Sequence, residues 1–167
     1  MNWKAILTWG VILGVLVVIW QFVMGLTGWY AHPGLMLLFF LVIPLNGGLV
    51  VVALAKTRND HGYGGQVAAG TLVGVVAGVL IACGSIVLVT VAVPTYFEDI
   101  AAMTETVLAQ QGVDAATISA RAEATRDMTP VTVALQGFIC TVLTSLVTAL
   151  IAAIWLRRKG PAPAAAA

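Results

Sequence analysis

The most reactive side chains of this sequence are two histidines, two cysteines and two serines. The cysteines and these two serines lie inside long apolar runs, whereas the histidines lie between the runs. Serine catalysis requires a nucleophile and a base within hydrogen-bond reach. Ser85 and Ser145 lie inside apolar runs, whereas His32 and His61 lie in connections on opposite sides of those runs. This separation argues against intramembrane serine chemistry. We therefore predict that the chain has no catalytic residues and is not an enzyme.

Metal and cofactor chemistry is also weakly supported. Cys83 and Cys140 have no histidine at their depth, so they cannot complete a tetrahedral zinc site. We predict two reduced, buried cysteines, with a single disulfide between them as the alternative. His32 precedes a proline and is interpreted as a turn residue, with ligation of a haem or pigment from a partner as the alternative. His61 lies in a glycine-rich turn that lacks the Lys and Ser/Thr of a phosphate loop. No metal site and no cofactor are predicted.

Four apolar runs must position these side chains: residues 5–26, 35–55, 67–93 and 131–156. Each is long enough for a helix that crosses a bilayer, which needs roughly 20 residues, and none contains an ionisable Asp, Glu, His, Lys or Arg. The first run is too long for a signal-peptide core and lacks a cleavage site, so we expect an uncleaved span. The predicted fold is an all-α, polytopic four-helix transmembrane bundle. We expect one domain over residues 1–159 and a disordered Ala/Pro tail at 160–167.

The charges between the runs are sorted by sign. Basic residues flank one set of run ends: Lys4, Lys56, Arg58, Arg157, Arg158 and Lys159. Acidic residues crowd the connection between the third and fourth runs: Glu98, Asp99, Glu105, Asp114, Glu123 and Asp127. Because basic residues in short loops stay in the cytoplasm, both termini are predicted to be cytoplasmic. Arg121 and Arg126 are expected to pair with Glu123 and Asp127. No basic stripe could follow a phosphate backbone, so nucleic acid is not an expected partner.

Residues 95–129 are predicted to form a helical hairpin outside the bilayer. Its signals are a capping box of Thr95 and Glu98, a helix stop at Gly112, a second helix cap at Asp114, and Pro130 in the first turn of the fourth span. The acidic side chains could attract a basic partner or cations. No segment has the alternating oxygen ligands and central glycine of a calcium loop. We therefore interpret the carboxylates as groups that serve solubility and topology.

Small residues at helical spacing predict close contacts between helices. The third run carries Gly70, Gly74, Gly78 and Ala82, and the fourth carries Gly137, Thr141, Ser145, Ala149 and Ala153. Gly10 and Gly14 form a shorter ridge in the first run. We predict that the third and fourth spans pack together, and we favour packing within one chain over a dimer seam. Gln21 and Gln136 are expected to hydrogen-bond between the first and fourth spans.

The second run contains the only predicted break in a span, made by Pro44, Asn46, Gly47 and Gly48. Pro44 cannot donate a hydrogen bond to the carbonyl of Phe40, so that carbonyl needs another donor, such as Asn46, or a local change of helix type. One interpretation is a structural kink. The other is a ligand or substrate site at the midplane, as broken helices provide in transporters. We favour the kink, because transporters usually add a second broken helix or an intramembrane charge.

The order of these features resembles a family of small bacterial four-helix membrane proteins catalogued as domain of unknown function 4199. The resemblance rests on the glycine-rich third span, on Pro94, Tyr96, Phe97 and Glu98, on the connector Gly112, Val113 and Asp114, on Thr129 and Pro130, and on the basic end from Arg157 to Lys159. It implies the fold and a location in the bacterial inner membrane. It implies no functional residue, because the family has no established activity.

Two functions are compatible with this sequence. The predicted one is a non-catalytic accessory or scaffolding subunit, which contacts other membrane subunits, or copies of itself, through its small-residue ridges and outer hairpin. The alternative is a small uncoupled transporter, facilitator or lipid-binding protein that uses the break near Asn46. Proton-coupled or ion-coupled transport is disfavoured because the spans lack ionisable residues.

Overall fold

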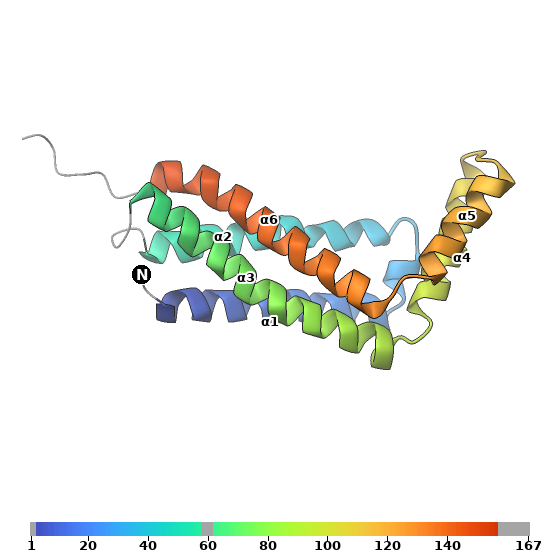
Figure 1. The fold of residues 1–167 in the computed structure, drawn as a ribbon, viewed down its shortest axis with the longest axis horizontal. Helices are drawn as coiled ribbons and strands as arrows, with labels where there is room; N and C mark the ends of the chain where they lie inside the picture. Colours follow the sequence, from blue (N-terminus) through green and yellow to red (C-terminus); the bar gives the residue numbers. More distant parts are fainter. Residues whose placement is uncertain (1–2, 58–61, 157–167) are drawn as a thin grey trace, which may run out of the picture.

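The computed structural model of the chain describes residues 3–57 and 62–156, and every regular element in these two segments is a helix. Four long apolar helices run side by side, and a pair of short helices lies crosswise at one end of them (Figure 1). The predicted all-α fold is confirmed. Arg58, His61, the basic residues at 157–159 and the predicted tail at 160–167 lie outside the described residues.

The first crossing is α1, Trp3–Leu26. A short 3-10 helix, η1 (Trp29–Ala31), leads to the second crossing, in which the 3-10 helix η2 (Met36–Leu41) continues as α2 (Val42–Thr57). The third crossing is α3 (Tyr63–Val87), extended by the π-helical turn η3 (Leu88–Ala92), and the fourth is α6 (Pro130–Leu156). All four are long and apolar enough to cross a membrane, so the chain is a polytopic membrane protein.

The short helices form the predicted hairpin, with α4 at Tyr96–Gln110 and α5 at Ala115–Arg126. Gly112 has a positive φ of 73°, and the amide of Val113 donates to the carbonyl of Leu108, which completes the expected helix stop. The Asp114 side chain accepts from the amide of Thr117 at 2.9 Å, which confirms the second cap. Pro130 begins α6 as predicted.

The predicted capping box at the start of α4 is wrong. The hydroxyl of Thr95 donates to the carboxylate of Asp99 at 2.9 Å and makes no hydrogen bond to the backbone. Glu98 instead forms an ion pair with Arg126 of α5. Arg126 on the neighbouring helix therefore binds the Glu98 side chain, which the local sequence pattern had assigned to the cap.

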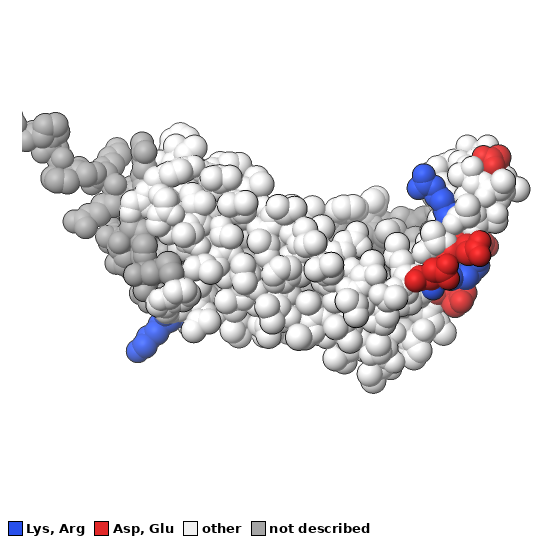
Figure 2. Space-filling model, viewed as in Figure 1, with Lys and Arg blue, Asp and Glu red and all other residues white. Residues whose placement is uncertain are grey.

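Burial follows the pattern expected of a bundle surrounded by lipid. The interior holds small and branched apolar residues such as Leu13, Val50 and Ile81, which are at most 1% exposed. Large apolar residues such as Leu37 and Trp155 face outward. On the face shown in Figure 2, charged side chains lie near the two ends of the molecule, with none between them. The apolar middle is the part that four spans would place in the hydrocarbon layer.

Candidate functional site

The second crossing changes helix type immediately before its predicted break. Residues 36–41 form a 3-10 helix, and the amide of Val42 donates to the carbonyls of Phe39 and Phe40. Pro44 is the third residue of α2 and has no N–H to offer the carbonyl of Phe40, which favours the shift to shorter-range hydrogen bonds upstream of it. The predicted irregularity is thus a narrow 3-10 segment before Pro44, whereas residues 44–48 are α-helical.

The four residues predicted at the break do not converge on one site. Asn46 is 2% exposed and points into the bundle, whereas Pro44 and Gly48 are exposed. Gly47 is half-buried, and a Cβ added to it would lie 3.5 Å from the Thr148 hydroxyl oxygen. The candidate site is therefore reduced to Asn46 and the residues around it.

Asn46 connects α2 to α6. Its side-chain N–H donates to the backbone carbonyl of Thr141 at 3.4 Å, and its carbonyl oxygen accepts from the hydroxyl of Ser145 at 3.0 Å. The expectation that Asn46 supplies a donor to Phe40 is wrong, because the amide faces the neighbouring helix instead. These two contacts use one of the two N–H donors of the amide.

A cavity of about 170 Å³ lies beside Asn46, in the half of the bundle nearer the hairpin. Its inner wall includes Val17 of α1 and Ile81 of α3, each 1% exposed. Its outer rim includes Phe40 and Ile43, which are 58% and 52% exposed. We call this cavity the lateral pocket, because its rim lies on the outward, lipid-facing surface of η2, α2 and α6.

Gln21 lies on the wall of the lateral pocket and hydrogen-bonds to Ser85 of α3, with 3.2 Å between its side-chain nitrogen and the serine oxygen. The predicted bond between Gln21 and Gln136 is wrong, because Gln136 is exposed on the outside of α6. A second cavity of about 50 Å³ shares Gln21 and Phe39 with the lateral pocket and extends toward the hairpin. Gln21 and Phe39 thus lie between the lateral pocket and a second cavity nearer the end of the bundle.

Two threonines of α6 also line the lateral pocket, Thr141 and Thr144. Other threonines, such as Thr71 and Thr90, donate to the carbonyl four residues earlier in their own helices. Among the described residues neither Thr141 nor Thr144 has a hydrogen bond from its hydroxyl. Thr141 was predicted only as a packing residue, and Thr144 was missed, although their helical spacing is visible in the sequence.

The cysteines contradict the prediction that they are buried. Cys83 and Cys140 are both free thiols and both exposed. Cys140 lies on the rim of the lateral pocket, whereas Cys83 lies in a separate surface groove beside Val18 and Phe22 of α1. Helical spacing alone placed both residues within spans but did not identify their outward faces.

The predicted ridges of small residues are contact surfaces inside the chain. A Cβ added to Gly70 would lie 2.6 Å from Cβ of Ala149, one added to Gly78 would lie 2.8 Å from the ring of Phe138, and Gly74 faces Ser145 as closely. The predicted pairing of the third and fourth spans is confirmed. Two further glycines, Gly10 and Gly14, lie against Val76 and Leu80, while Ala82 and Gly137 are half-buried.

The hairpin contacts the bundle through aromatic and polar groups that the sequence patterns did not identify. The hydroxyl of Tyr30 donates a short hydrogen bond to Asp99, and the Tyr30 ring stacks on Tyr96 with 4.9 Å between centroids. Burial raises the pKa of Tyr30 well above its ordinary value, and the hydrogen bond and charge of Asp99 raise it further. Burial also raises the pKa of Tyr96. This cluster joins η1 to α4.

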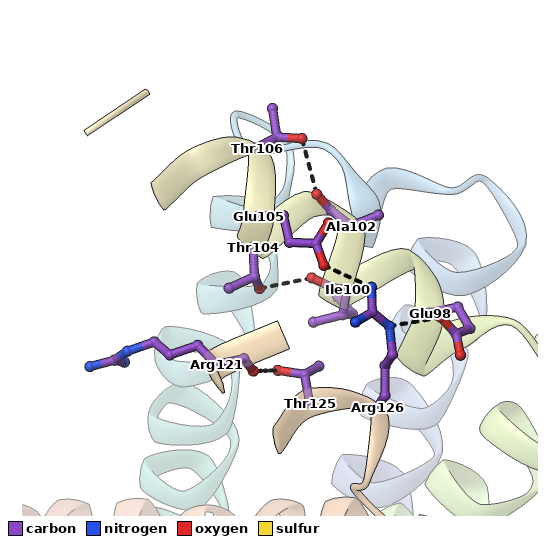
Figure 3. A network of polar contacts seen from close by, with 9 residues as sticks. All are labelled: Glu98, Ile100, Ala102, Thr104, Glu105, Thr106, Arg121, Thr125 and Arg126. Carbon is purple, nitrogen blue, oxygen red and sulfur yellow. Dashed lines mark hydrogen bonds and ion pairs between the residues drawn. The ribbon is translucent and has the colours of Figure 1, made fainter. Parts of the chain in front are cut away.

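Within the hairpin, Arg126 joins α5 to α4. Its guanidinium lies 3.1 Å from Glu98 and 2.7 Å from Glu105, and Figure 3 shows both ion pairs. The predicted pairing of Arg126 with Asp127 is wrong, and the Arg121 side chain points away from this network in Figure 3. Within residues 3–57 and 62–156, no three His, Cys, Asp or Glu side chains are grouped closely enough to hold a metal ion.

Comparison with curated proteins found no match, and neither did comparison with solved structures. Comparison with protein families found a match over residues 8–158, which include all or nearly all of each long helix and the whole hairpin. The family is described as "Protein of unknown function (DUF4199)". The resemblance noted in the sequence is thereby confirmed, and the chain belongs to this family.

Proposed function

We propose that this chain is a non-catalytic membrane protein that binds a lipid-soluble small molecule in the lateral pocket. The observation that carries this proposal is the position of the pocket. Its rim faces the lipid side of the bundle, and its wall includes the buried amide of Asn46. A molecule dissolved in the bilayer can therefore enter from the side and meet polar groups inside.

The volume of the pocket limits how much of such a molecule it can hold. An engineered apolar cavity of about 150 Å³ binds benzene, and the lateral pocket is about 170 Å³. It therefore accommodates one ring-sized group and is too small for a whole two-chain lipid. The rest of the ligand would remain among the lipid chains outside the rim.

This function is favoured over scaffolding because the chain itself uses the surfaces that suggested a scaffold. The close-contact face of α3 is covered by α6, and Gly10 and Gly14 of α1 are covered by α3. A second helix would have to displace these contacts before it could use the same glycines. The ridges thus contribute to folding and leave little small-residue surface for another subunit.

An accessory-subunit role remains the second candidate, and the hairpin is the observation that favours it. Helix α5 is exposed along most of its length, with Ala122 as its buried residue, and the hairpin extends crosswise from the bundle end (Figure 1). Purification from native membranes in mild detergent, followed by mass spectrometry, tests this role. A stoichiometric co-purifying membrane protein would support it, and isolation of the chain alone would count against it.

For location, we propose a bacterial inner membrane with both termini in the cytoplasm. Lys4 and Lys56 lie at the ends of α1 and α2 away from the hairpin, and acidic residues lie on the hairpin. Basic residues flanking spans favour the cytoplasmic side. Reporter fusions test this orientation: alkaline phosphatase inserted at the Gly112 turn should be active, and the same enzyme at the C-terminus should be inactive. The reverse pattern would overturn the proposed topology.

The two cysteines give a matched test of binding. In a Cys83→Ala variant the remaining thiol is Cys140, at the pocket rim, and in Cys140→Ala it is Cys83, outside the pocket. Each variant is placed in phosphatidylcholine nanodiscs and labelled with N-ethylmaleimide, with and without decylbenzene. We expect decylbenzene to slow labelling of Cys140 severalfold and to leave Cys83 unchanged. Equal effects on both thiols would contradict binding in the lateral pocket.

A further inference from the structure

We propose that the part of the ligand held in the lateral pocket is an uncharged carbonyl group, which accepts hydrogen bonds from Asn46 and Thr141. The inference rests on the proposed function, because it specifies the chemistry of the molecule bound at the same site. It follows from which donors and acceptors of the pocket wall already have partners.

One N–H donor of the Asn46 side-chain amide is unused. Its carbonyl oxygen already accepts from the hydroxyl of Ser145, and one N–H donates to the carbonyl of Thr141. This arrangement fixes the orientation of the amide, because exchanging its oxygen and nitrogen would place two acceptors face to face. The second N–H has no partner among the described residues. With 2% of the side chain exposed, it can be satisfied only from the pocket side.

Thr141 offers a second donor to the same pocket. The residue is 6% exposed, lines the pocket, and makes no hydrogen bond from its hydroxyl to a described residue. A threonine in a helix ordinarily donates to the carbonyl four residues earlier, as Thr71 does to Val67 at 2.9 Å. The hydroxyl of Thr141 is therefore free to donate to a bound molecule.

Gln21 contributes a third donor on the side toward the hairpin. The single hydroxyl proton of Ser85 is best placed on the carbonyl of Ile81, 2.8 Å away, so Ser85 accepts from the Gln21 side-chain nitrogen. One N–H of Gln21 then remains unused. Unused donors of Asn46, Thr141 and Gln21 thus line the lateral pocket, and a ligand group that accepts hydrogen bonds can pair with them.

The absence of charge excludes ionised groups from the lateral pocket. No residue that lines the lateral pocket, all within the described part of the chain, is charged. An ion buried there would have no counter-ion, so the ligand group is neutral. The unused donors of Asn46 and Thr141 need a neutral acceptor, and a carbonyl is the simplest such group. A carbonyl oxygen accepts two hydrogen bonds and brings none.

Two membrane compounds share this chemistry: a quinone, with the carbonyl on its ring, and an acylglycerol, with the carbonyl in its ester. Both combine an uncharged carbonyl with an apolar chain that could extend past Phe40 and Ile43 into the lipid. The ring-sized volume accommodates either end group. The shared carbonyl is the predicted recognition element, and the experiment below separates the two sources.

The test compares phenyl nonyl ketone with decylbenzene, which have the same ring and chain length and differ in the carbonyl oxygen. Protection of Cys140 from N-ethylmaleimide is measured in nanodiscs of the Cys83→Ala protein at equal mole fractions of each probe. We expect the ketone to protect at about tenfold lower concentration, the effect of one to two added hydrogen bonds at a buried site. Equal protection by both probes would overturn this inference and leave the proposed function standing. Absence of protection by either probe would overturn both.

The matched variants are Thr141→Val and Thr148→Val. Both remove a hydroxyl with no hydrogen bond among the described residues from the same face of α6, so neither should impair folding, but Thr148 does not line the lateral pocket. Thr141→Val should reduce the preference for the ketone severalfold without changing protection by decylbenzene, and Thr148→Val should leave both unchanged. A preference for the ketone that is undiminished in Thr141→Val would overturn the assignment.

A final pair of probes identifies the source of the carbonyl. The probes are monodecanoylglycerol and a decyl trimethylbenzoquinone, whose ring has no free position for thiol addition. Stronger protection by the quinone would assign a ring carbonyl, and stronger protection by the glyceride would assign an ester. If neither protected better than decylbenzene, the carbonyl proposal would be wrong.

Discussion

Helix α6 has two neighbours that it contacts in opposite ways. Against α3 it packs closely, through pairs of small residues such as Gly70 with Ala149 and Gly74 with Ser145. Against α2 it makes polar contacts through Asn46 and leaves the lateral pocket beside them. One helix thus carries a close-packed interface on one side and a polar interface with a cavity on the other.

The difference arises from what each neighbour offers. Helix α3 presents a glycine every fourth residue, so backbones approach closely and space is excluded along the whole ridge. The second crossing begins as the narrower 3-10 helix η2, whose Phe39 and Phe40 line the pocket without filling it. The hydrogen bonds that Asn46 donates to Thr141 and accepts from Ser145 hold α2 and α6 together without close packing. Polar contacts fix the position of a helix, whereas small-residue ridges also remove the space beside it.

The largest effect is expected from breaking the close-packed side. Gly70→Leu would place a side chain 2.6 Å from Cβ of Ala149, which is fully buried and cannot move aside. We expect a loss of about 3 kcal/mol in the free energy of unfolding, at the upper end of the usual cost of overpacking. Unfolding by sodium dodecyl sulfate in mixed micelles, followed by circular dichroism, measures this loss.

Gly48→Ala is the control for that substitution. No described atom lies within 4 Å of the added methyl group, and the residue lies in an α-helix. Its stability should change by less than about 0.5 kcal/mol, as is usual for an outward-facing substitution. If Gly48→Ala destabilised the protein as much as Gly70→Leu, the contrast between the two sides of α6 would not hold.

The second effect is smaller and concerns the polar side. Asn46→Leu removes the hydrogen bonds to Ser145 and to the Thr141 carbonyl. We expect a loss of about 1 to 2 kcal/mol, the range measured for interhelical hydrogen bonds in membranes. A double-mutant cycle with Ser145→Ala isolates the contact between the two side chains. Strictly additive losses would show that the Asn46 and Ser145 side chains do not stabilise each other.

The sequence predicted the close-packed side of α6 better than the polar side, for a physical reason. Glycines repeated every four residues form one stripe on any helix, so Gly70, Gly74 and Gly78 could be assigned to a contact face without knowing the fold. The lengths of the spans follow similarly from apolar composition. The same pattern on α6, including Ser145 and Ala149, then indicated its partner.

The lateral pocket could not be derived in this way. Pro44 signalled a change of helix type, and Asn46 was identified as the polar residue beside it. Which way Asn46 points depends on where the 3-10 segment ends, and periodicity does not give that position. The outward exposure of Cys140 has the same origin. The pocket is a space left between four helices, so it depends on all their orientations together.

The third prediction concerns the polar contact between Tyr30 and Asp99, which high pH should weaken while the close packing of α3 is unchanged. The raised pKa of Tyr30 means that the folded state keeps its proton where the unfolded state has lost it. The stabilisation is complete below the ordinary tyrosine pKa of about 10 and is lost as the pH rises above that value. Hydrogen exchange in α4, corrected for the base-catalysed increase that all amides share, should therefore accelerate above pH 10, while corrected exchange in the middle of α3 stays slow.

Tyr30→Phe is the control for this pH dependence. It removes the hydrogen bond to Asp99 and keeps the ring that stacks on Tyr96. Exchange in α4 should be faster than in the unmodified chain at neutral pH and should show a weaker rise above pH 10. If the rise were unchanged in this variant, a group other than Tyr30 would be responsible for it.

The smallest effect is expected at the ion pairs of Arg126. The Arg126 side chain is 39% exposed, and the partner side chains of Glu98 and Glu105 are 69% and 42% exposed, so solvent and salt screen both contacts. Arg126→Gln should loosen the packing of α5 on α4 at low ionic strength, measured as faster hydrogen exchange in α5, and the difference from the unmodified chain should shrink at 1 M salt. The destabilisation caused by Gly70→Leu should not depend on salt concentration, because its cost is steric. Salt sensitivity would then separate the two kinds of contact more sharply than stability does. A salt-dependent Gly70→Leu defect would contradict the assignment of the α3–α6 interface to close packing alone.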